Sequence, residues 1–440
     1  MTDSEVRTLS PIEREAAYRR NFRLFLVDAI MFTVAMGIIG PSTVIPDFIR
    51  RLTDSEVLIG LSSSLFDIGW MLPQLFMARY LVRVARKKWW FAGPNIVVRF
   101  AIPVFAVIIL LLGAERRGAI LLAFLICYGI AAVGDGIVGV PWVDLVGSSL
   151  DDHRRARLFG FMTAISGVIM LGVAPLVGLI LSERGPGFPG NYALLFGIAG
   201  ALFLISIVPP LFLKELPSGK ATETILPFRE YIPQLGRVLR DDRAFRAMII
   251  VRMLSSLFMM GGPFYIGFAT VRLGLSSEVA VPTLLAMQTI GTISGALVYA
   301  WMGARHNLLY IRLALLLVAV LPASALLARV AGPLPLYAGF FAAGLALSNL
   351  FASYLNWIIM HATPEQRPIY TGLFNTVAAV TLLTAPLIGG TLAEAVGYEA
   401  VFAVALAMAL GAFYVVMHYI PTPRPAPAET EPAPVAGPAG

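Results

Sequence analysis

The sequence predicts an all-α membrane protein in which twelve transmembrane helices form two pseudo-symmetric six-helix bundles, and three observations support this fold. Hydrophobic residues make up 58% of the 440-residue chain and charged residues 13%, whereas a soluble domain is about half apolar and about a quarter charged. Apolar stretches long enough to cross a bilayer recur along the chain. Features of the first half also reappear in the second half.

The predicted spans are stretches of about 20 apolar residues, the length that crosses a bilayer as a helix. In the N-terminal bundle (22–213) they lie at 22–46, 57–78, 89–112, 118–147, 157–182 and 191–213. In the C-terminal bundle (245–420) they lie at 245–271, 279–302, 307–329, 333–361, 369–394 and 398–420. The remaining segments are a cytoplasmic N-terminal segment (1–21), a cytoplasmic linker (214–244) and a tail (421–440) whose Pro, Ala, Glu and Thr content predicts disorder.

The linker carries an amphipathic pattern. Phe228, Ile232, Leu235 and Leu239 recur at helical spacing, with arginines between them. This pattern is typical of a short helix that lies on the membrane surface. A flexible linker is the alternative.

Positively charged residues set the predicted orientation, because the cytoplasmic loops of membrane proteins carry an excess of Lys and Arg. Most of the 33 Lys and Arg fall in segments that are cytoplasmic if the N-terminus is inside. The external loops hold only Arg50, Arg51, Arg116, Arg117, Arg184, Arg272 and Arg329. We therefore expect a multi-pass protein of the cell (plasma or inner) membrane with both termini in the cytoplasm. The net charge of +7 then reflects topology and requires no nucleic-acid partner.

Motifs of enzymes and cofactor proteins are missing from the sequence. Cys127 is the single cysteine, so an intrachain disulfide is impossible. The one Gly-Lys step, SGKA, lacks the upstream glycine and the following Ser or Thr of a phosphate-binding P-loop. Because no nucleophile–base or metal-ligand pattern is present either, we expect no enzymatic activity, no cofactor and no metal.

An internal repeat relates the two halves. APLVG at 174–178 reappears as APLIGG at 385–390, and PWVDL at 141–145 aligns with SYLNW at 353–357. NIVVRFA in the third span likewise matches LLYIRLA in the ninth. The separation between the paired segments is nearly constant. Gene duplication therefore explains the matches better than chance.

The loop after the second span, ARYLVRVARKK, carries a recognisable signature. It is similar to the pattern G-x-x-x-D-R-x-G-R-[RK], with Arg83, Arg86 and Lys87 in place. Val82 and Ala85 stand where that pattern usually has Asp and Gly. With the repeat and the twelve spans, this loop makes residues 20–420 resemble the major facilitator superfamily of secondary transporters.

The fifth span is less informative about the type of transporter. Pro175 and Gly178 match the antiporter-associated motif G-x-x-x-G-P-x-x-G-G of that family, but Ala174 and Leu179 depart from it. The resemblance implies that spans 1, 4, 7 and 10 line a central cavity. Ionisable residues in those spans are therefore the first candidates for function.

Asp135 and Asp144 lie in the predicted fourth span. The helical rise and rotation place Asp135 near mid-membrane and Asp144 near the cytoplasmic end, on opposite faces, so the two cannot form one carboxylate pair. Asp135 is predicted to be a proton or substrate site, with a hydrogen-bonded structural aspartate as the alternative. Asp144 is a candidate for a gating salt bridge or a plain interfacial ion pair. Trp142 shares the face of Asp135 and could form a wall of the cavity.

Asp28 and Arg252 occupy corresponding shallow positions in spans 1 and 7. They could pair across the cavity, or Arg252 could hold an anionic group of a substrate. Extension of both side chains to the membrane interface is the alternative.

Polar groups in spans 2 and 10 complete the candidate set. Asp67 is a candidate for gating or proton coupling, because the second span faces the other half in this family. Asn349, Ser353 and Asn356 form one stripe of the tenth span that could bind a polar substrate or join helices. Arg99 and Arg312, early in spans 3 and 9, are predicted to be structural.

The function predicted from these features is secondary active transport of a small organic solute by alternating access, coupled to protons. The carboxylates and the missing ATPase motif favour proton coupling. Drug-type efflux and uptake of a sugar or organic anion both remain open. A non-transporting membrane sensor or scaffold on the same fold is the alternative. We expect the protein to act as a monomer in the lipid bilayer.

Overall fold

The structure, a computed structural model, describes residues 10–81, 87–215, 236–302, 306–362 and 367–421. These residues form helices and connecting turns, without a strand among them. The N-terminal half contains α1 (Pro11–Ile39), α2 (Val44–Arg50), α3 (Glu56–Leu81), α4 (Lys88–Leu112), α5 (Arg117–Ser149), α6 (Asp152–Leu181) and α7 (Gly190–Leu211). The C-terminal half contains α9 (Arg243–Leu257), η1 (Phe258–Gly261), α10 (Phe264–Gly267), η2 (Phe268–Arg272), α11 (Ser277–Met302), α12 (Asn307–Val318), α13 (Val320–Ala331), α14 (Leu334–Leu347), α15 (Leu350–His361), α16 (Arg367–Ala395) and α17 (Tyr398–His418).

These elements make twelve long helical segments, since α1–α2, α9–η2, α12–α13 and α14–α15 each form one segment with a local break. Within the described residues, eleven segments are long and apolar enough to cross a membrane. The twelfth, α3, has 26 residues but includes polar residues such as Asp67. The predicted fold class of twelve membrane helices in two bundles is confirmed.

The first helix begins earlier than its apolar stretch predicts. Ser10 and Glu13 form a capping box, in which each side chain bonds to the backbone N–H of the other residue. The cap starts α1 at Pro11, so this helix extends beyond the apolar part of the span that was expected to begin at residue 22.

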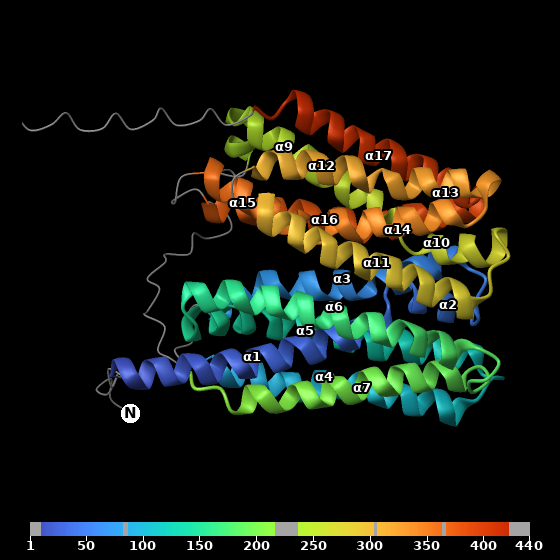
Figure 1. Cartoon of the computed structure of the whole chain (residues 1–440), viewed down its shortest axis with the longest axis horizontal. Helices are drawn as coiled ribbons and strands as arrows, with labels where there is room; N and C mark the ends of the chain where they lie inside the picture. The colour runs from blue at the N-terminus through green and yellow to red at the C-terminus, as the bar shows by residue number, and fades with distance from the viewer. Residues whose placement is uncertain (1–9, 82–86, 216–235, 303–305, 363–366, 422–440) are drawn as a thin grey trace, which may run out of the picture.

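The two halves lie one above the other in Figure 1, with α1 to α7 below and α9 to α17 above. We call the end at which α1 begins and α17 finishes the terminal end. The other end, where α2 lies, is the opposite end. Helices α3 and α6 of the lower half and α11 and α16 of the upper half lie along the boundary between the halves.

Each half has an aromatic core toward the opposite end. In the N-terminal half, the ring of Phe48 lies 4.8 Å from that of Tyr192 and 5.4 Å from that of Phe196. In the C-terminal half, Tyr265 stacks on Phe402 with ring centroids 4.5 Å apart. These rings are fully buried, so each half is a packed bundle.

Spans 1 and 7 are both broken at a Gly-Pro pair. Gly40 ends α1 in a left-handed conformation with a φ of 54°, and Pro41 follows it. In span 7, Gly262 and Pro263 separate η1 from α10. Proline has no N–H to continue the helical ladder, and glycine tolerates positive φ. The two breaks lie in the first span of each half, a likeness that the sequence pattern did not predict.

Two predictions fall outside the described residues. The amphipathic pattern of the linker includes Phe228, Ile232 and Leu235, which the structure does not describe. Most of the predicted disordered tail, residues 422–440, is likewise not described.

Candidate functional site

The halves are joined by hydrogen bonds at the opposite end. The carboxylate of Glu394, at the end of α16, accepts a bond of 2.9 Å from the hydroxyl of Ser55 and one of 3.2 Å from the backbone N–H of Val57. Glu394 therefore caps the N-terminus of α3 from the other half, where a negative charge is favourable. Gly390 lets the backbones meet, since a Cβ on it would lie 2.6 Å from the Cα of Val57.

A second set of polar contacts lies beside this cap. Arg50 forms an ion pair of 2.7 Å with Glu56 and donates a bond of 3.2 Å to the hydroxyl of Tyr398, which also bonds to Glu56. The hydroxyl of Ser277 donates a bond of 2.7 Å to Asp47. Both sets join residues of different halves, so the opposite end is closed. The sequence does not predict these contacts between the halves, because the partners are hundreds of positions apart.

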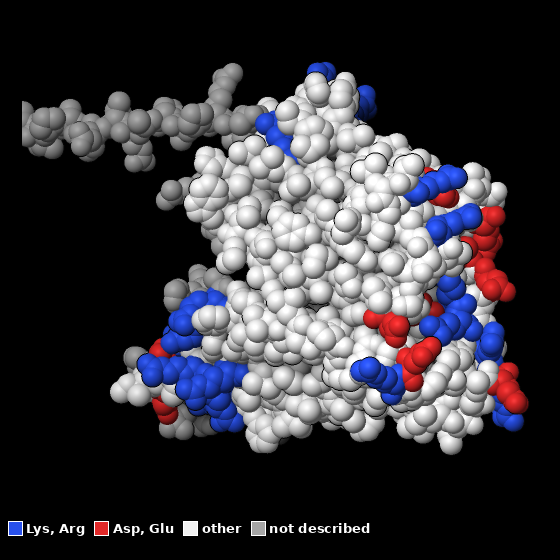
Figure 2. All heavy atoms as spheres, turned by 45° about the vertical axis from the view of Figure 1, so that its right-hand side comes forward, with Lys and Arg blue, Asp and Glu red and all other residues white. Residues whose placement is uncertain are grey.

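At the terminal end the halves separate. Figure 2 shows a hollow between them on this side, and Lys and Arg gathered around the terminal end of the N-terminal half. Helix α1 contributes Arg19, Arg20 and Arg23, which are exposed. The opposite end instead carries basic and acidic residues together. The described conformation is thus closed at one end and open at the other.

Asp135 is paired inside the N-terminal half. Its carboxylate lies 3.1 Å from the guanidinium of Arg99, and both side chains are at most 8% exposed. The guanidinium also lies 4.5 Å from the ring of Phe32 and 5.0 Å from that of Phe203. Arg99 is thus held within its own half, where its ion-pair partner is Asp135.

The glycines that flank Asp135 explain why α5 can carry it so deeply. A Cβ on Gly134 would lie 2.1 Å from the side chain of Val98 in α4, and one on Gly136 would lie 2.4 Å from the carbonyl of Trp70 in α3. The space that a side chain at either glycine would need is thus filled by a neighbouring helix. Close approach of α4 brings Arg99, next to Val98, within reach of Asp135.

Asp28 has a different environment. Its Oδ2 accepts a bond of 3.0 Å from the indole N–H of Trp142, while its Oδ1 is buried and has no hydrogen-bond partner among the described residues. Asp28 also interacts electrostatically with both Arg99 and Asp135. Trp142 therefore contacts Asp28, in addition to sharing a helix with Asp135.

Arg252 lies against aromatic rings of its own half. Its guanidinium is 5.6 Å from the ring of Phe351, 5.8 Å from that of Tyr354 and 5.3 Å from that of Phe374. Its Nε is buried and unpartnered within the described chain. In this conformation Asp28 and Arg252 are therefore held separately, each by its own half. Since Trp142 aligns with Tyr354 in the repeat, the two charges of opposite sign have equivalent aromatic neighbours.

The stripe of span 10 is partly committed to helix contacts. Asn349 lies in the break between α14 and α15, and the buried hydroxyl of Ser353 donates a bond of 2.9 Å to its carbonyl. The amide of Asn307 in α12 donates a bond of 2.9 Å to the carbonyl of Ser353. Asn356 is only half-buried. Ser353, one residue of this predicted stripe, thus joins α12 and α15 within the C-terminal half.

The other candidates are placed as follows. Asp67 lies in the middle of α3, at the boundary with the other half. Lys87 is the N-cap of α4, and its backbone N–H donates to the carboxylate of Glu215. Arg83, Arg86 and the side chain of Asp144 lie outside the described residues.

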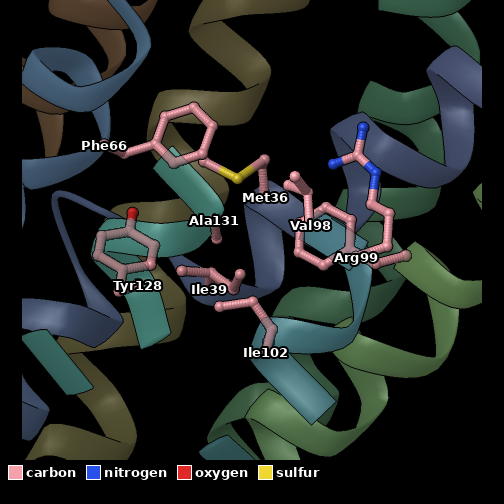
Figure 3. A pocket seen from close by; sticks show the side chains of 9 residues that line it. Met36, Ile39, Phe66, Val98, Arg99, Ile102, Tyr128 and Ala131 are labelled. Carbon is pink, nitrogen blue, oxygen red and sulfur yellow. The ribbon is translucent and has the colours of Figure 1, made fainter. Parts of the chain in front are cut away.

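A small cavity lies inside the N-terminal half beside the charged pair. Figure 3 shows Phe66, Ile39 and Ile102 around it, with the guanidinium of Arg99 directed away from these apolar side chains. Its volume is about 10 Å³, which is no more than one water molecule needs. This cavity is therefore too small to hold an organic substrate.

Two six-helix bundles that meet at one end and enclose buried charges define a multi-pass membrane protein with the two-bundle transporter fold. The family comparison matches the Major Facilitator Superfamily over residues 27–328 and 276–438. The chain belongs to this superfamily of membrane transporters, whose members carry small molecules across the bilayer. The predicted recognition is thereby confirmed. No curated protein matches the sequence significantly.

Solved structures of transporters share this fold. A mutant of the nucleoside transporter NupG matches with a TM-score of 0.68 and 15% identity, over 90% of this chain and 99% of that one. The human organic anion transporter MFSD10 matches with a TM-score of 0.61 and 16% identity, over 93% and 100%. A bacterial homologue of the iron transporter ferroportin, in an inward-facing state, matches with a TM-score of 0.63 and 13% identity, over 91% and 99%. At these identities the likeness concerns the fold.

Proposed function

We propose that this protein is a proton-coupled secondary transporter that moves a small organic solute by alternating access. Its two halves carry interactions that can form and break at one end, which is the element such a mechanism requires. The Glu394 cap and the Arg50–Glu56–Tyr398 contacts close one end, and the hollow opens at the other. The protein then acts as a monomer, because each chain has both halves.

The orientation follows from charge. Lys and Arg gather at the terminal end, and basic residues near membrane helices remain on the cytoplasmic side. With the terminal end in the cytoplasm, the hollow opens inward. The conformation described here is then the inward-facing one, and both termini lie in the cytoplasm, on the inner side of the cell membrane.

The single observation that supports proton coupling is the unbonded oxygen of Asp28. Asp28, Asp135 and Arg99 place two carboxylates and one guanidinium within electrostatic reach of one another, away from water. One proton makes this group neutral, and burial favours the neutral state. Because Asp135 is already paired with Arg99, the exchangeable proton belongs on Asp28.

The solute is proposed to bind between the halves, near Trp142 and Arg252. Trp142 covers Asp28, so a solute that displaces the indole would change the hydrogen bonding of the carboxylate. Arg252 offers a cation without a carboxylate partner among the described residues. This arrangement couples solute binding to the protonation of Asp28 and favours a solute with an anionic or strongly polar group.

The test is solute-driven proton movement in proteoliposomes that contain the full chain and a pH-sensitive dye. Nucleosides, sugars and organic anions are added one at a time, and at least one is expected to change the internal pH. Asp28→Asn is expected to abolish this change, because the side chain can no longer exchange a proton.

Asp54→Asn is the matched control, because Asp54 is exposed and has no part in the proposed pathway. It should leave the proton signal unchanged. Solute uptake by Asp28→Asn with the same pH dependence as the unaltered protein would contradict proton coupling at this residue.

A further inference from the structure

A cavity between the halves is separate from the Asp28 group. It lies on the boundary just inside the closed opposite end, and its volume is about 50 Å³. That is room for a water molecule or a small ion with a bound water. Its polar lining includes Ser42, Ser64 and Asp67 from the N-terminal half, and the C-terminal half contributes Pro263, Leu382 and Pro386.

Asp67 faces this cavity without a counter-ion. Asp67 is an exposed residue, and it belongs to the lining of this cavity. In the described part of the chain no basic side chain pairs with it, and it interacts electrostatically with the phenol of Tyr128. A lone carboxylate at this depth is costly, and a bound cation would remove that cost.

Breaks in the helices supply further oxygen atoms. The Gly-Pro breaks of spans 1 and 7 both reach the cavity, through Pro41 and Ser42 on one side and Gly262 and Pro263 on the other. Pro386 has no N–H, so the carbonyl of Leu382 loses its helical donor. Broken helices, whose carbonyls are released from the ladder, hold the coupling ions of several membrane transporters.

We propose that this cavity binds one sodium ion, whose charge is balanced by Asp67. Carboxylate, hydroxyl and carbonyl oxygens are the ligands that hard cations prefer, and a single carboxylate matches a single positive charge better than a divalent one. The proposal goes beyond proton-coupled transport, because it adds a second ion at a separate site.

The site also implies an effect on conformation. Its lining comes from both halves, so an ion held there binds the conformation in which the opposite end is closed. A ligand that prefers one conformation shifts the population toward it. Sodium is therefore expected to favour closure at the Glu394 cap.

The first experiment measures binding of ²²Na⁺ to the purified full chain, with potassium or choline as competitors. We expect saturable binding that sodium displaces and choline does not. Asp67→Asn should lose most of it, and Ser64→Ala should weaken it. Pro386→Ala should weaken it too, because the new N–H can bond to the carbonyl of Leu382. Monodispersity in gel filtration establishes that each variant is folded.

Asp28→Asn distinguishes this proposal from proton-coupled transport, since it should retain full ²²Na⁺ binding. Absence of saturable sodium binding in the unaltered protein would overturn the sodium site, whatever the outcome of the proton assay. Equal sodium binding by Asp67→Asn and the unaltered protein would overturn it as well. A change only in the pH dependence of transport by Asp67→Asn, without sodium binding, would assign a proton to this carboxylate instead.

The second experiment follows the closed end directly. Spin labels at Arg184→Cys and Val330→Cys, both exposed residues of different halves, are introduced in a Cys127→Ser background. Replacement of potassium by sodium should increase the share of short distances between the labels. The same response after Asp67→Asn, or no response at all, would overturn the conformational effect.

Discussion

Asp135 and Asp28 lie in the same half, but the surrounding helices give them different partners. The sequence indicates their depth, because the helical rise fixes the position of each residue along its span. It cannot indicate that Arg99 bonds to Asp135 or that Trp142 bonds to Asp28. Those contacts depend on the rotation of α1, α4 and α5 about their axes, which packing determines.

Removal of one partner of the buried ion pair between Arg99 and Asp135 should lower the stability of the folded protein. Asp135→Asn leaves the guanidinium of Arg99 without its direct ion-pair partner in a site that is 7% exposed. The loss is expected to be about 3 kcal/mol of stability. It can be measured by chemical unfolding in detergent, with the exposed Asp54→Asn as the control.

Simultaneous replacement of both partners gives the discriminating result. Arg99→Leu with Asp135→Leu should be more stable than Asp135→Asn alone, because neither member of the ion pair is left buried without the other. A double variant at least as unstable as the sum of its single variants would show that the pair acts through other contacts.

At the scale of elements, the sequence predicts the spans well and their local breaks poorly. Apolar length predicts the membrane-spanning stretches because a bilayer sets one scale for all of them, whereas a capping box places the start of α1 outside its apolar stretch. The breaks at Gly40–Pro41 and Gly262–Pro263 are also encoded, as Gly-Pro pairs in the first span of each half. The break at Asn349 has no comparable signal. The sequence alone could therefore not place it.

The contact between α3 and α16 depends on the absence of a side chain at Gly390. Gly390→Ala should push the backbones apart, because its Cβ would meet the backbone of Val57. We expect the labels at Arg184→Cys and Val330→Cys to move to longer distances. Gly172→Ala, where a Cβ meets nothing within 4 Å, is the control, and an equal change there would contradict this explanation.

The start of α9 should respond to acid. Asp242 caps α9 through the N–H of Phe245 and also bonds to His361 and Tyr370. Partial burial opposes ionisation of Asp242, but these three donors hold its pKa below the usual range. A lowered pKa means that the stabilisation is present above the ordinary carboxyl pKa of 3.8 and is lost as the pH falls through the lowered value.

Asp242→Asn tests this cap. The unaltered protein should lose stability on acidification in this range, whereas Asp242→Asn should be less stable at neutral pH and less sensitive to acid. The readout is the midpoint of thermal unfolding against pH. The exposed neighbour Asp241 provides the control Asp241→Asn, which should keep the acid response.

At the scale of the whole molecule, the conformation depends on contacts between segments hundreds of residues apart. Glu394 and Tyr398 belong to α16 and α17, the last two helices. Their partners Val57 and Glu56 belong to α3, in the other half. The internal repeat predicts two similar halves. It does not predict which end of the pair is closed, since both ends are compatible with the same helices.

Glu394→Gln should shift the molecule toward the conformation that opens at the opposite end. The amide still accepts a hydrogen bond but lacks the charge that favours the N-terminus of α3. The labels at Arg184→Cys and Val330→Cys should report more long distances. Glu399→Gln is the control, because Glu399 pairs with Arg329 of its own half at 3.6 Å. An equal shift in both variants would contradict a specific role for the Glu394 cap.

The sequence by itself determined the class of protein, the twelve spans, the repeat and the charges carried within the spans. These features follow from composition and from lengths along one chain, which a bilayer constrains strongly. Only the tertiary structure decided which charges meet, that Ser353 bonds within its own half, that Asp67 faces a cavity shared by both halves, and that one end is closed. Those facts depend on how helices rotate and approach one another, and the energies that fix this come from contacts between residues far apart in the chain.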